Sequence, residues 1–178
     1  INSHSHWDHV WGNSLFSSSQ IIGHKKCREY IQQDGPAELK ENDKYHRGKI
    51  ILTCPNLTIT EEIKFEDDNV IVYYTPGHTD DSISVLDISD RVLFAGDNLE
   101  RPIPFLMSKD LKRYVQTLQD YLEAEADIVI GGHTACEDKG LIEHNLQYVK
   151  KVLSGEKIEM ESKEFEEYHL SNMEKLGQ

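Results

Sequence analysis

Four potential metal ligands lie within six residues near the start of the sequence. They are His4, His6, Asp8 and His9, in the segment H-S-H-W-D-H. Imidazole nitrogen and carboxylate oxygen suit Zn²⁺, Fe or Mn. The surrounding Asn, Ser and Gly residues favour a loop that leads into a helix. Such a turn can direct two side chains that are two residues apart at one metal ion, while Asp8 and His9 face a second ion. This segment predicts a metal centre, and the alternative is a solvated polar loop.

Three further candidate ligands each follow a short apolar run. His78 follows NVIVYYTPG, Asp97 follows RVLFAG and His133 follows DIVIGG. Such runs predict buried strands, and the ends of strands at one edge of a sheet converge in space. Each candidate is preceded by a glycine that permits a sharp turn. A single Gly-His or Gly-Asp pair indicates no more than a turn, but three in order behind the first motif predict one ligand set.

Between residues 49 and 95 the sequence consists of short runs rich in Val, Ile, Thr and Tyr, separated by Pro, Gly, Asn and Asp. This pattern predicts several strands in succession that form a sheet. The runs are ILT, LTIT, IKF, NVIVYYT, SISVLDI and RVLFA. Before them, residues 24–34 predict a short helix that ends at Gly35 and Pro36, and the polar stretch to Gly48 predicts a surface segment.

Two helices and one strand are predicted after this sheet. Ser108 is predicted to cap a helix whose apolar stripe is Leu111, Val115, Leu118 and Leu122. The run DIVI then predicts a strand. A second helix, from Asp138, has a stripe formed by Leu141, Ile142, Leu146, Val149 and Val152. The last two dozen residues are highly charged and predict a solvated helix or a tail that docks elsewhere.

In this order, the motifs resemble those of the metallo-β-lactamase superfamily. The family has H-x-H-x-D-H, T-P-G-H-T, a G-D after a strand and a late G-H, and the sequence matches them at residues 4–9, 75–79, 96–97 and 132–133. The resemblance covers roughly residues 1–153. It implies a mixed α/β (α+β) fold, the αββα sandwich, with two sheets face to face and helices outside. We therefore predict a domain at 1–153 followed by an acidic helix or tail at 154–178.

The position of the first motif bears on how complete this domain is. In the family the H-x-H-x-D-H loop normally follows several strands of the first sheet, whereas here it begins at residue 4. The resemblance therefore implies a domain that lacks the first strands of its N-terminal sheet. Because an unpaired sheet edge invites pairing, we expect either a missing N-terminal segment or a second copy, in a homo-oligomer, that completes the sheet.

The resemblance also assigns the ligands. It implies that His4, His6 and His78 bind one metal ion, that Asp8, His9 and His133 bind a second, and that Asp97 bridges the two. Two divalent ions are expected, with zinc favoured and iron or manganese as alternatives. A shared hydroxide, available at neutral pH because coordination lowers the pKa of water, would attack a carbonyl carbon while the metals stabilise the oxyanion. Asp8 would orient the hydroxide and shuttle a proton.

Several branches of the family fit less well. The family's best-known β-lactamases have cysteine or serine at the position of Asp97, and the diiron flavoproteins usually have glutamate at that of His6. We therefore predict a hydrolase of thioesters, lactones or related esters, similar to the glyoxalase II and lactonase branches. The acidic segment 154–178 argues against a glutathione thioester, because glyoxalase II has a basic extension there. Alternatives are a non-catalytic or regulatory metal-binding module, a β-lactam or phosphodiester hydrolase, and a mononuclear-iron persulfide dioxygenase.

Net charge and cysteine content limit which classes of binding partner and which cellular compartment are expected. The 178 residues carry 19 basic and 32 acidic side chains, so the net charge is 19 − 32 = −13. This balance disfavours nucleic acid and anionic lipid, and no apolar run approaches the roughly 18–20 residues of a membrane span. A small-molecule substrate is therefore expected. The three separated cysteines fit free thiols in a reducing compartment, which predicts a cytoplasmic protein.

A few residues near the motifs have two interpretations. Cys136 is either an accessory ligand or, as we favour, a small buried thiol. Trp7 and Trp11 are expected to form walls of the site. The apolar residues after Asp97 form either an acyl pocket or a core-facing connector, and they are Ile103, Phe105, Leu106 and Met107. The other histidines are expected at the surface or at helix caps, and they are His24, His46, His144 and His169.

Overall fold

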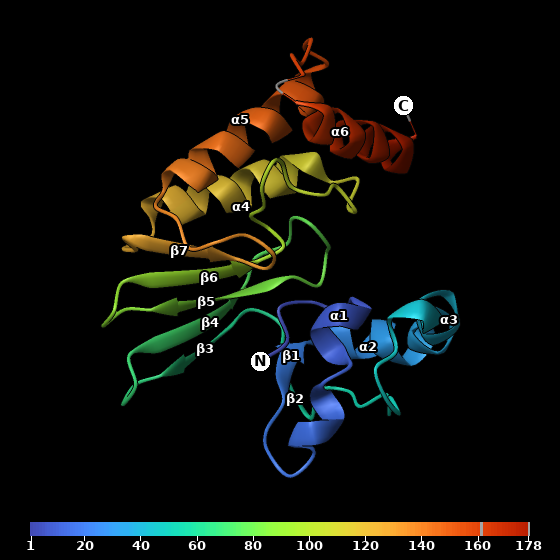
Figure 1. Ribbon diagram of the computed structural model, residues 1–178. Coiled ribbons are helices and arrows are strands. Elements are labelled where there is room, and N and C mark those ends of the chain that lie inside the picture. Colours follow the sequence, from blue (N-terminus) through green and yellow to red (C-terminus); the bar gives the residue numbers. More distant parts are fainter. Residues whose placement is uncertain (161, 178) are drawn as a thin grey trace.

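A five-stranded sheet forms the centre of the molecule (Figure 1). The computed structural model describes residues 1–160 and 162–177. The strands are β3 (Glu62–Phe65), β4 (Val70–Tyr74), β5 (Ile83–Asp87), β6 (Val92–Gly96) and β7 (Ile128–Gly131), and they lie side by side in chain order. The first four pair antiparallel, whereas β7 lies parallel to β6. The chain therefore leaves β6 and β7 at the same edge of the sheet.

Two long helices cover one face of this sheet, and they are α4 (Leu111–Glu123) and α5 (Gly140–Ser154). The alternation of side chains along the strands sends Leu93, Ala95 and Val129 towards the helices. These residues and the apolar stripes of both helices form the largest buried cluster. The two helices and the β7 strand confirm the sequence-based predictions, apart from the cap of α4, which is Asp110 and not Ser108 because the Asp110 carboxylate accepts the Arg113 N–H.

A smaller sheet faces the other side. It consists of β1 (Ile22–His24) and β2 (Leu57–Ile59), which pair in parallel. Ile22 and Ile59 pack against Val72 and Ile83 of the large sheet. The helical segments lie outside this pair: α1 (Trp7–Val10), η1 (Asn13–Phe16), α2 (Lys25–Gln33), α3 (Gly35–Glu41) and η2 (Asp43–Tyr45). The layers run helix, sheet, sheet, helix, as the predicted sandwich requires.

Three local details differ from the sequence-based predictions. The first motif is only partly a loop, because Asp8 and His9 lie in α1. The predicted surface segment after Gly35 contains a second helix, α3, in which Pro36 occupies the first turn and therefore loses no intrahelical hydrogen bond. The run ILT at 51–53 is not a strand. Within the described part of the chain, no helix has the length and apolar character needed to cross a membrane.

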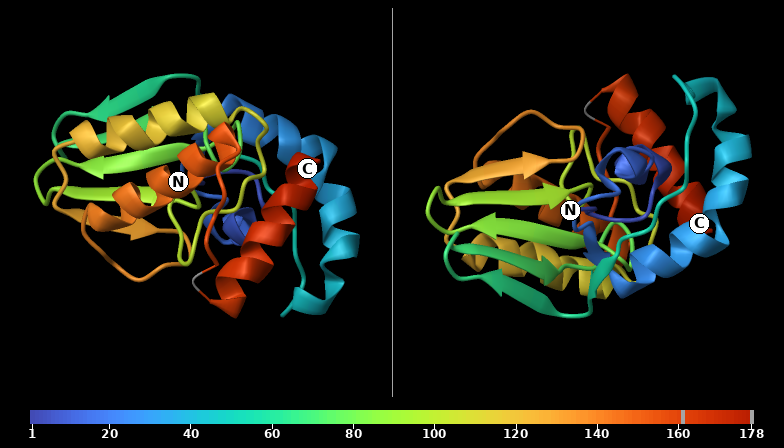
Figure 2. Two further views of the ribbon diagram at one scale, coloured as in Figure 1. Left: turned by 90° about the horizontal axis from the view of Figure 1, so that it is seen from above. Right: turned by 90° about the horizontal axis from the view of Figure 1, so that it is seen from below.

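The C-terminal segment forms a docked helix, α6 (Lys163–Leu176). Both views of Figure 2 place it at the same end of the molecule as α2 and α3. Its Phe165 is buried in the large cluster, and Tyr168 stacks on Phe105. Asn172 is fully buried, where it accepts the Leu106 N–H and donates to the Pro104 carbonyl and the Tyr148 hydroxyl, each at 2.9 Å. This helix therefore fixes the connector that follows Asp97.

The Asn172 contacts generate a test of this docking. Asn172→Ala leaves one buried N–H and two buried acceptors without their partner, so we expect the free energy of unfolding to fall by about 2–3 kcal/mol in urea denaturation. Leu170→Ala, on the same helix but 60% exposed, is the control and should change it by less than about 0.5 kcal/mol. Equal effects of the two substitutions would contradict the assigned role of Asn172.

Candidate metal centre

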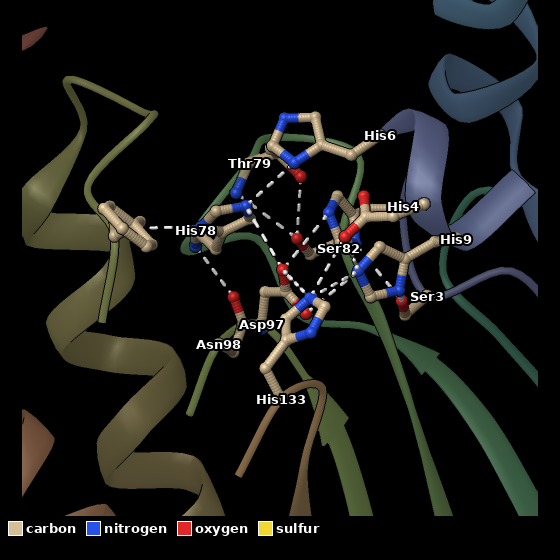
Figure 3. Close-up of polar contacts among 12 residues, drawn as sticks. Ser3, His4, His6, His9, His78, Thr79, Ser82, Asp97, Asn98 and His133 are labelled. Atoms are coloured by element: carbon tan, nitrogen blue, oxygen red, sulfur yellow. Dashed lines mark hydrogen bonds and ion pairs between the residues drawn. The ribbon is translucent and has the colours of Figure 1, made fainter. Parts of the chain in front are cut away.

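The carboxylate of Asp97 lies at the centre of the predicted ligand set (Figure 3). Its Oδ2 is 3.8 Å from His4 Nε2, 3.9 Å from His78 Nε2 and 3.5 Å from His133 Nε2. Its Oδ1 is 3.2 Å from His9 Nε2. One carboxylate thus faces both groups of predicted ligands, which is the arrangement that a bridging ligand needs.

The ligand atoms form two groups. His4, His6, His78 and Asp97 form the first, and Asp8, His9 and His133 form the second, with the atoms of each group within 4.8 Å of one another. His78 Nε2 is 3.1 Å from His6 Nδ1, and His9 Nε2 is 3.3 Å from His133 Nε2. Two ligands at about 2.1 Å from a tetrahedral ion lie about 3.4 Å apart. All seven predicted residues are therefore brought together, while their roles as ligands stay a prediction.

The ends of β6 and β7 position Asp97 and His133. Parallel pairing sets Gly96 opposite Gly131, so the next residues of both strands emerge at the same edge. Gly132 must be glycine, because a Cβ there would collide with Asp97 Oδ1. The loop after His133 is held to the segment after Asp97 by a bidentate ion pair between Arg101 and Glu137. Both candidate ligands therefore lie at one edge of the sheet, where the ion pair holds their loops together.

The neighbour of Asp97 holds the loop of His78, another candidate ligand. Asn98 Oδ1 accepts the backbone N–H of His78 at 2.7 Å, and its Nδ2 donates to the Thr75 carbonyl and the Tyr121 hydroxyl. The ring of His78 is oriented separately, since its Nδ1 is 2.8 Å from the Phe105 carbonyl oxygen. A proton on Nδ1 leaves the Nε2 lone pair facing Asp97, which is the tautomer that binds metal.

Ser3 orients two histidines of the first motif. Its hydroxyl oxygen is 3.1 Å from His4 Nδ1 and 3.3 Å from His9 Nδ1. An oxygen that accepts both Nδ1–H groups fixes both rings with Nε2 directed at Asp97. The Ser residue next to the motif was the only available sequence signal for this role, and the sequence-based prediction missed it.

Burial keeps the first group of histidines neutral. Burial and, after it, the neighbouring histidines lower the pKa of His4, and the same causes bring the pKa of His78 down to about 4. Burial also lowers the pKa of His9, but the contact with Asp97 outweighs it, so the net shift is upward. For Asp97, burial raises the pKa, and the contact with His9 and the charges of His9, His78 and His133 reverse the shift. The result is an ionised carboxylate beside the neutral imidazoles of His4 and His78, which is the protonation state that binds a divalent ion, whereas at His9 a metal ion would compete with a proton.

Two buried atoms indicate that this group fits a metal ion. His4 Nε2 and Asp97 Oδ1 are shielded from solvent and make no hydrogen bond of acceptable geometry within the described structure. Buried polar atoms without a hydrogen bond are costly, and a cation between them would remove that cost. The donor set of imidazole nitrogens and carboxylate oxygens is the one that zinc, iron and manganese accept.

A cavity of about 430 Å³ opens over these ligands. Trp7, Phe105 and Met107 form its apolar wall, while Ile103 and Leu106 are buried in the core. The apolar residues after Asp97 therefore divide between the two predicted roles. Trp11 does not line this cavity but packs edgewise against the ring of His46 and against Trp7.

Charged residues that the sequence-based prediction missed also line the cavity. They are Glu38 and Glu41 of α3, Glu100 of the connector and Lys175 of α6. Burial, followed by the charges of Asp97 and Asp8, raises the pKa of Glu100 to about 8. An acidic residue three positions after Asp97, in an otherwise apolar stretch, was a signal that could have identified it. A larger cavity of about 780 Å³ lies alongside and reaches the centre only at His6.

The remaining cysteine and histidines have non-ligand positions. Cys136 is exposed, so the prediction of a buried thiol was wrong, and it belongs to none of the ligand groups found among the described residues. The other two cysteines are free. His24 accepts the Lys26 N–H at the start of α2, as a cap residue does, and is buried against Tyr74.

Comparisons with known proteins agree with this geometry. The model of the metallo-beta-lactamase superfamily matches residues 1–133. The chain is 30% identical over 138 residues to a "Beta-lactamase-like protein 2 homolog" of Drosophila melanogaster, covering 74% of this chain and 42% of the relative. It is 29% identical over 151 residues to an "N-acyl homoserine lactonase" of Bacillus cereus, covering 79% and 57%. The chain thus spans about half the length of these relatives.

Solved structures show the same fold. The crystal structure of DIM-1 metallo-beta-lactamase superposes with a TM-score of 0.68 at 19% identity, covering 85% of this chain and 68% of that one. A metallo-beta-lactamase family protein of Thermus thermophilus gives a TM-score of 0.64 at 16% identity, covering 86% and 59%. These similarities confirm the predicted α+β sandwich.

The central position of Asp97 generates a prediction about metal content. We expect Asp97→Ala to retain far less metal after dialysis than the unmodified protein, as measured by elemental analysis, because the substitution removes a member of the first group and the carboxylate that faces the second. Asp127→Ala is the control, since Asp127 pairs with Arg91 at an exposed site away from the ligands. Two full equivalents of metal in Asp97→Ala would count against a bridging role.

The lowered pKa of His78 generates a prediction about the metal-free protein. Between pH 6.5 and about 4, His78 is protonated in the unfolded chain but not in the folded protein. The free energy of unfolding therefore decreases as the pH falls through this range. We expect the free energy of unfolding in chelator to drop by about 1–3 kcal/mol from pH 7 to pH 4.5. The pKa of His9 is shifted in the opposite direction and partly offsets this effect. The unmodified protein is therefore compared with His78→Asn, whose free energy of unfolding should depend less on pH. An equal dependence in both proteins would contradict the assignment.

Proposed function

Because this chain belongs to the metallo-β-lactamase superfamily, we propose that it is a metal-dependent hydrolase of small carbonyl compounds, namely thioesters, lactones or related esters. The observation that carries the proposal is the position of Asp97 between two groups of ligand atoms. Two divalent ions, with zinc favoured over iron or manganese, would occupy these groups. Bound there, they would supply activated water at neutral pH and polarise the carbonyl oxygen of the substrate.

The side chains of the site would have separate roles in holding the ions and in moving a proton. His4, His6 and His78 would hold the first ion, His9 and His133 would help to hold the second, and Asp97 would keep the two at a fixed separation. Asp8 Oδ2 is 3.2 Å from His133 Nε2 and 3.6 Å from His9 Nε2. The Asp8 side chain is 29% exposed, so its carboxylate can orient water in the cavity and pass a proton to solvent.

The polarity of the cavity supports a substrate without several negative charges. Glu38 and Glu41 form an acidic side, and Lys175 is the one cationic side chain that lines the cavity in the described structure. Such a wall repels a polyanionic thioester such as one of glutathione. Trp7, Phe105 and Met107 offer an apolar surface to an acyl chain. An uncharged acyl ester or lactone is therefore the favoured substrate, and the lactonase relative is in accord with this choice.

The substrate class is tested by a panel assayed with metal-loaded protein. Lactones, thioesters, esters, β-lactams, phosphodiesters and a persulfide cover the proposed substrates and the alternatives. We expect the highest kcat/KM with an uncharged acyl lactone or ester. Higher kcat/KM with a β-lactam, a phosphodiester or a persulfide would favour the corresponding alternative, and two bound metals with no turnover would favour a non-catalytic module.

The role of Asp8 is tested in the same assay. Asp8→Asn should lower kcat by about 10²–10⁴-fold at saturating metal, because the amide cannot accept the proton. The control is Glu41→Gln, which removes a carboxylate from the same cavity outside the ligand groups. Undiminished kcat in Asp8→Asn would show that the proton leaves by another route.

A further inference from the structure

A third carboxylate lies beside the second group of ligands. An oxygen of Glu100 lies within 4.8 Å of the ligand atoms of both Asp97 and His133, and these three residues form a ligand group of their own. Glu100 lines the cavity over the centre, yet the residue is only 4% exposed. No role was assigned to it by the motifs in the sequence, because it belongs to none of them.

The backbone at Glu100 is fixed by one buried side chain. Asn145 of α5 is fully buried, its Oδ1 accepts the Glu100 N–H at 2.9 Å, and its Nδ2 donates to the Glu100 carbonyl at 2.9 Å. The flanking Leu99 and Ile103 are fully buried in the large cluster. The connector is therefore rigid at this point, and the carboxylate of Glu100 is directed at the centre by the fold.

The Glu100 carboxylate has no partner that would explain its burial. Within the described residues it accepts no hydrogen bond and forms no ion pair, and Asp97 and Asp8 are both of the same charge. A buried carboxylate is strongly unfavourable unless it is paired or coordinates a metal. The residue that shares its ligand group, His133, already faces the second predicted ion.

We infer that Glu100 is a further ligand of the second metal ion, beside Asp8, His9, Asp97 and His133. This inference rests on the metal centre of the proposed function. The set around that ion then contains three carboxylates and two imidazoles, so the ion has more than four protein ligands. An oxygen-rich set of this size suits manganese or iron better than zinc, which prefers four ligands, so the preference for zinc in the proposed function then holds for the first ion only. The first ion, held by three histidines and Asp97, keeps a set typical of zinc.

The test uses the full chain and titrates metal-free protein with Zn²⁺ and with Mn²⁺ in a calorimeter. Glu100→Gln preserves size and both backbone hydrogen bonds to Asn145. We expect the second equivalent of metal to bind at least about tenfold more weakly, with a larger loss for Mn²⁺ than for Zn²⁺, and the first equivalent to be unchanged. In a cobalt-substituted protein, the visible absorption should intensify as the coordination number of the second ion falls.

Two variants separate coordination from charge. Glu100→Asp keeps the charge but shortens the side chain, so it should also weaken the second equivalent. Glu41→Gln removes a charge from the same cavity outside the ligand groups and should leave both equivalents nearly unchanged. If Glu100→Asp binds the second equivalent of metal as tightly as the unmodified protein, or if Glu41→Gln weakens it equally, Glu100 acts only through its charge. Either result would overturn its role as a ligand.

Stability distinguishes a ligand from a structural residue. Glu100→Gln replaces a buried carboxyl group that has no partner, so the metal-free variant should be at least as stable as the unmodified protein, while the metal-bound form loses stabilisation. Equal destabilisation with and without metal would overturn the inference. If the unmodified protein binds two ions and Glu100→Gln binds them equally well, only this inference fails; if the unmodified protein binds none, the proposed function fails with it.

Discussion

The Asp97 carboxylate is the interaction on which the candidate site depends. Four histidines direct a ring nitrogen at it from distances of 3.2–3.9 Å. Without a negative charge at this point, buried imidazoles with facing lone pairs would repel one another and lack hydrogen bonds. The glycine at 132 lets this carboxylate approach the β7 end, and Asn98 holds the His78 loop against it. Much of the local structure therefore positions the Asp97 carboxylate and the groups that face it.

The large sheet supplies this geometry through its one parallel pair. A parallel register places Asp97 and His133 at the same edge, where an antiparallel β7 would have placed them at opposite ends. Between these strands the chain must cross the sheet, and it does so through the connector and α4. That connector carries Phe105, whose carbonyl orients His78, and Glu100, which faces the centre. The crossover thus contributes to the site as well as to the topology.

The candidate ligands at the strand ends could be predicted from the sequence because each depends on local pattern. An apolar run followed by Gly and a His or Asp fixes both the strand and the position of the polar residue. Contacts between distant segments were not predictable in this way. Nothing near Asn172 or Asn145 in the sequence indicates that these amides hold the connector at residues 104–106 and at Glu100, since only the packing of α5 and α6 brings them there. The exposed position of Cys136 likewise could not be deduced from its residue type.

Charge links the centre to the stability of the fold. Asp8, Asp97 and the ionised form of Glu100 that metal binding would require place three negative charges in one small volume, and burial keeps His4 and His78 neutral, so these imidazoles do not compensate them. Two divalent ions would add four positive charges, which leaves a net charge of −3 + 4 = +1 and attracts an oxyanion or a water molecule ready to ionise. Metal binding and folding should therefore be coupled, because the arrangement that is unfavourable when empty becomes favourable when filled. The same excess of positive charge is what a carbonyl substrate needs as its oxygen gains negative charge.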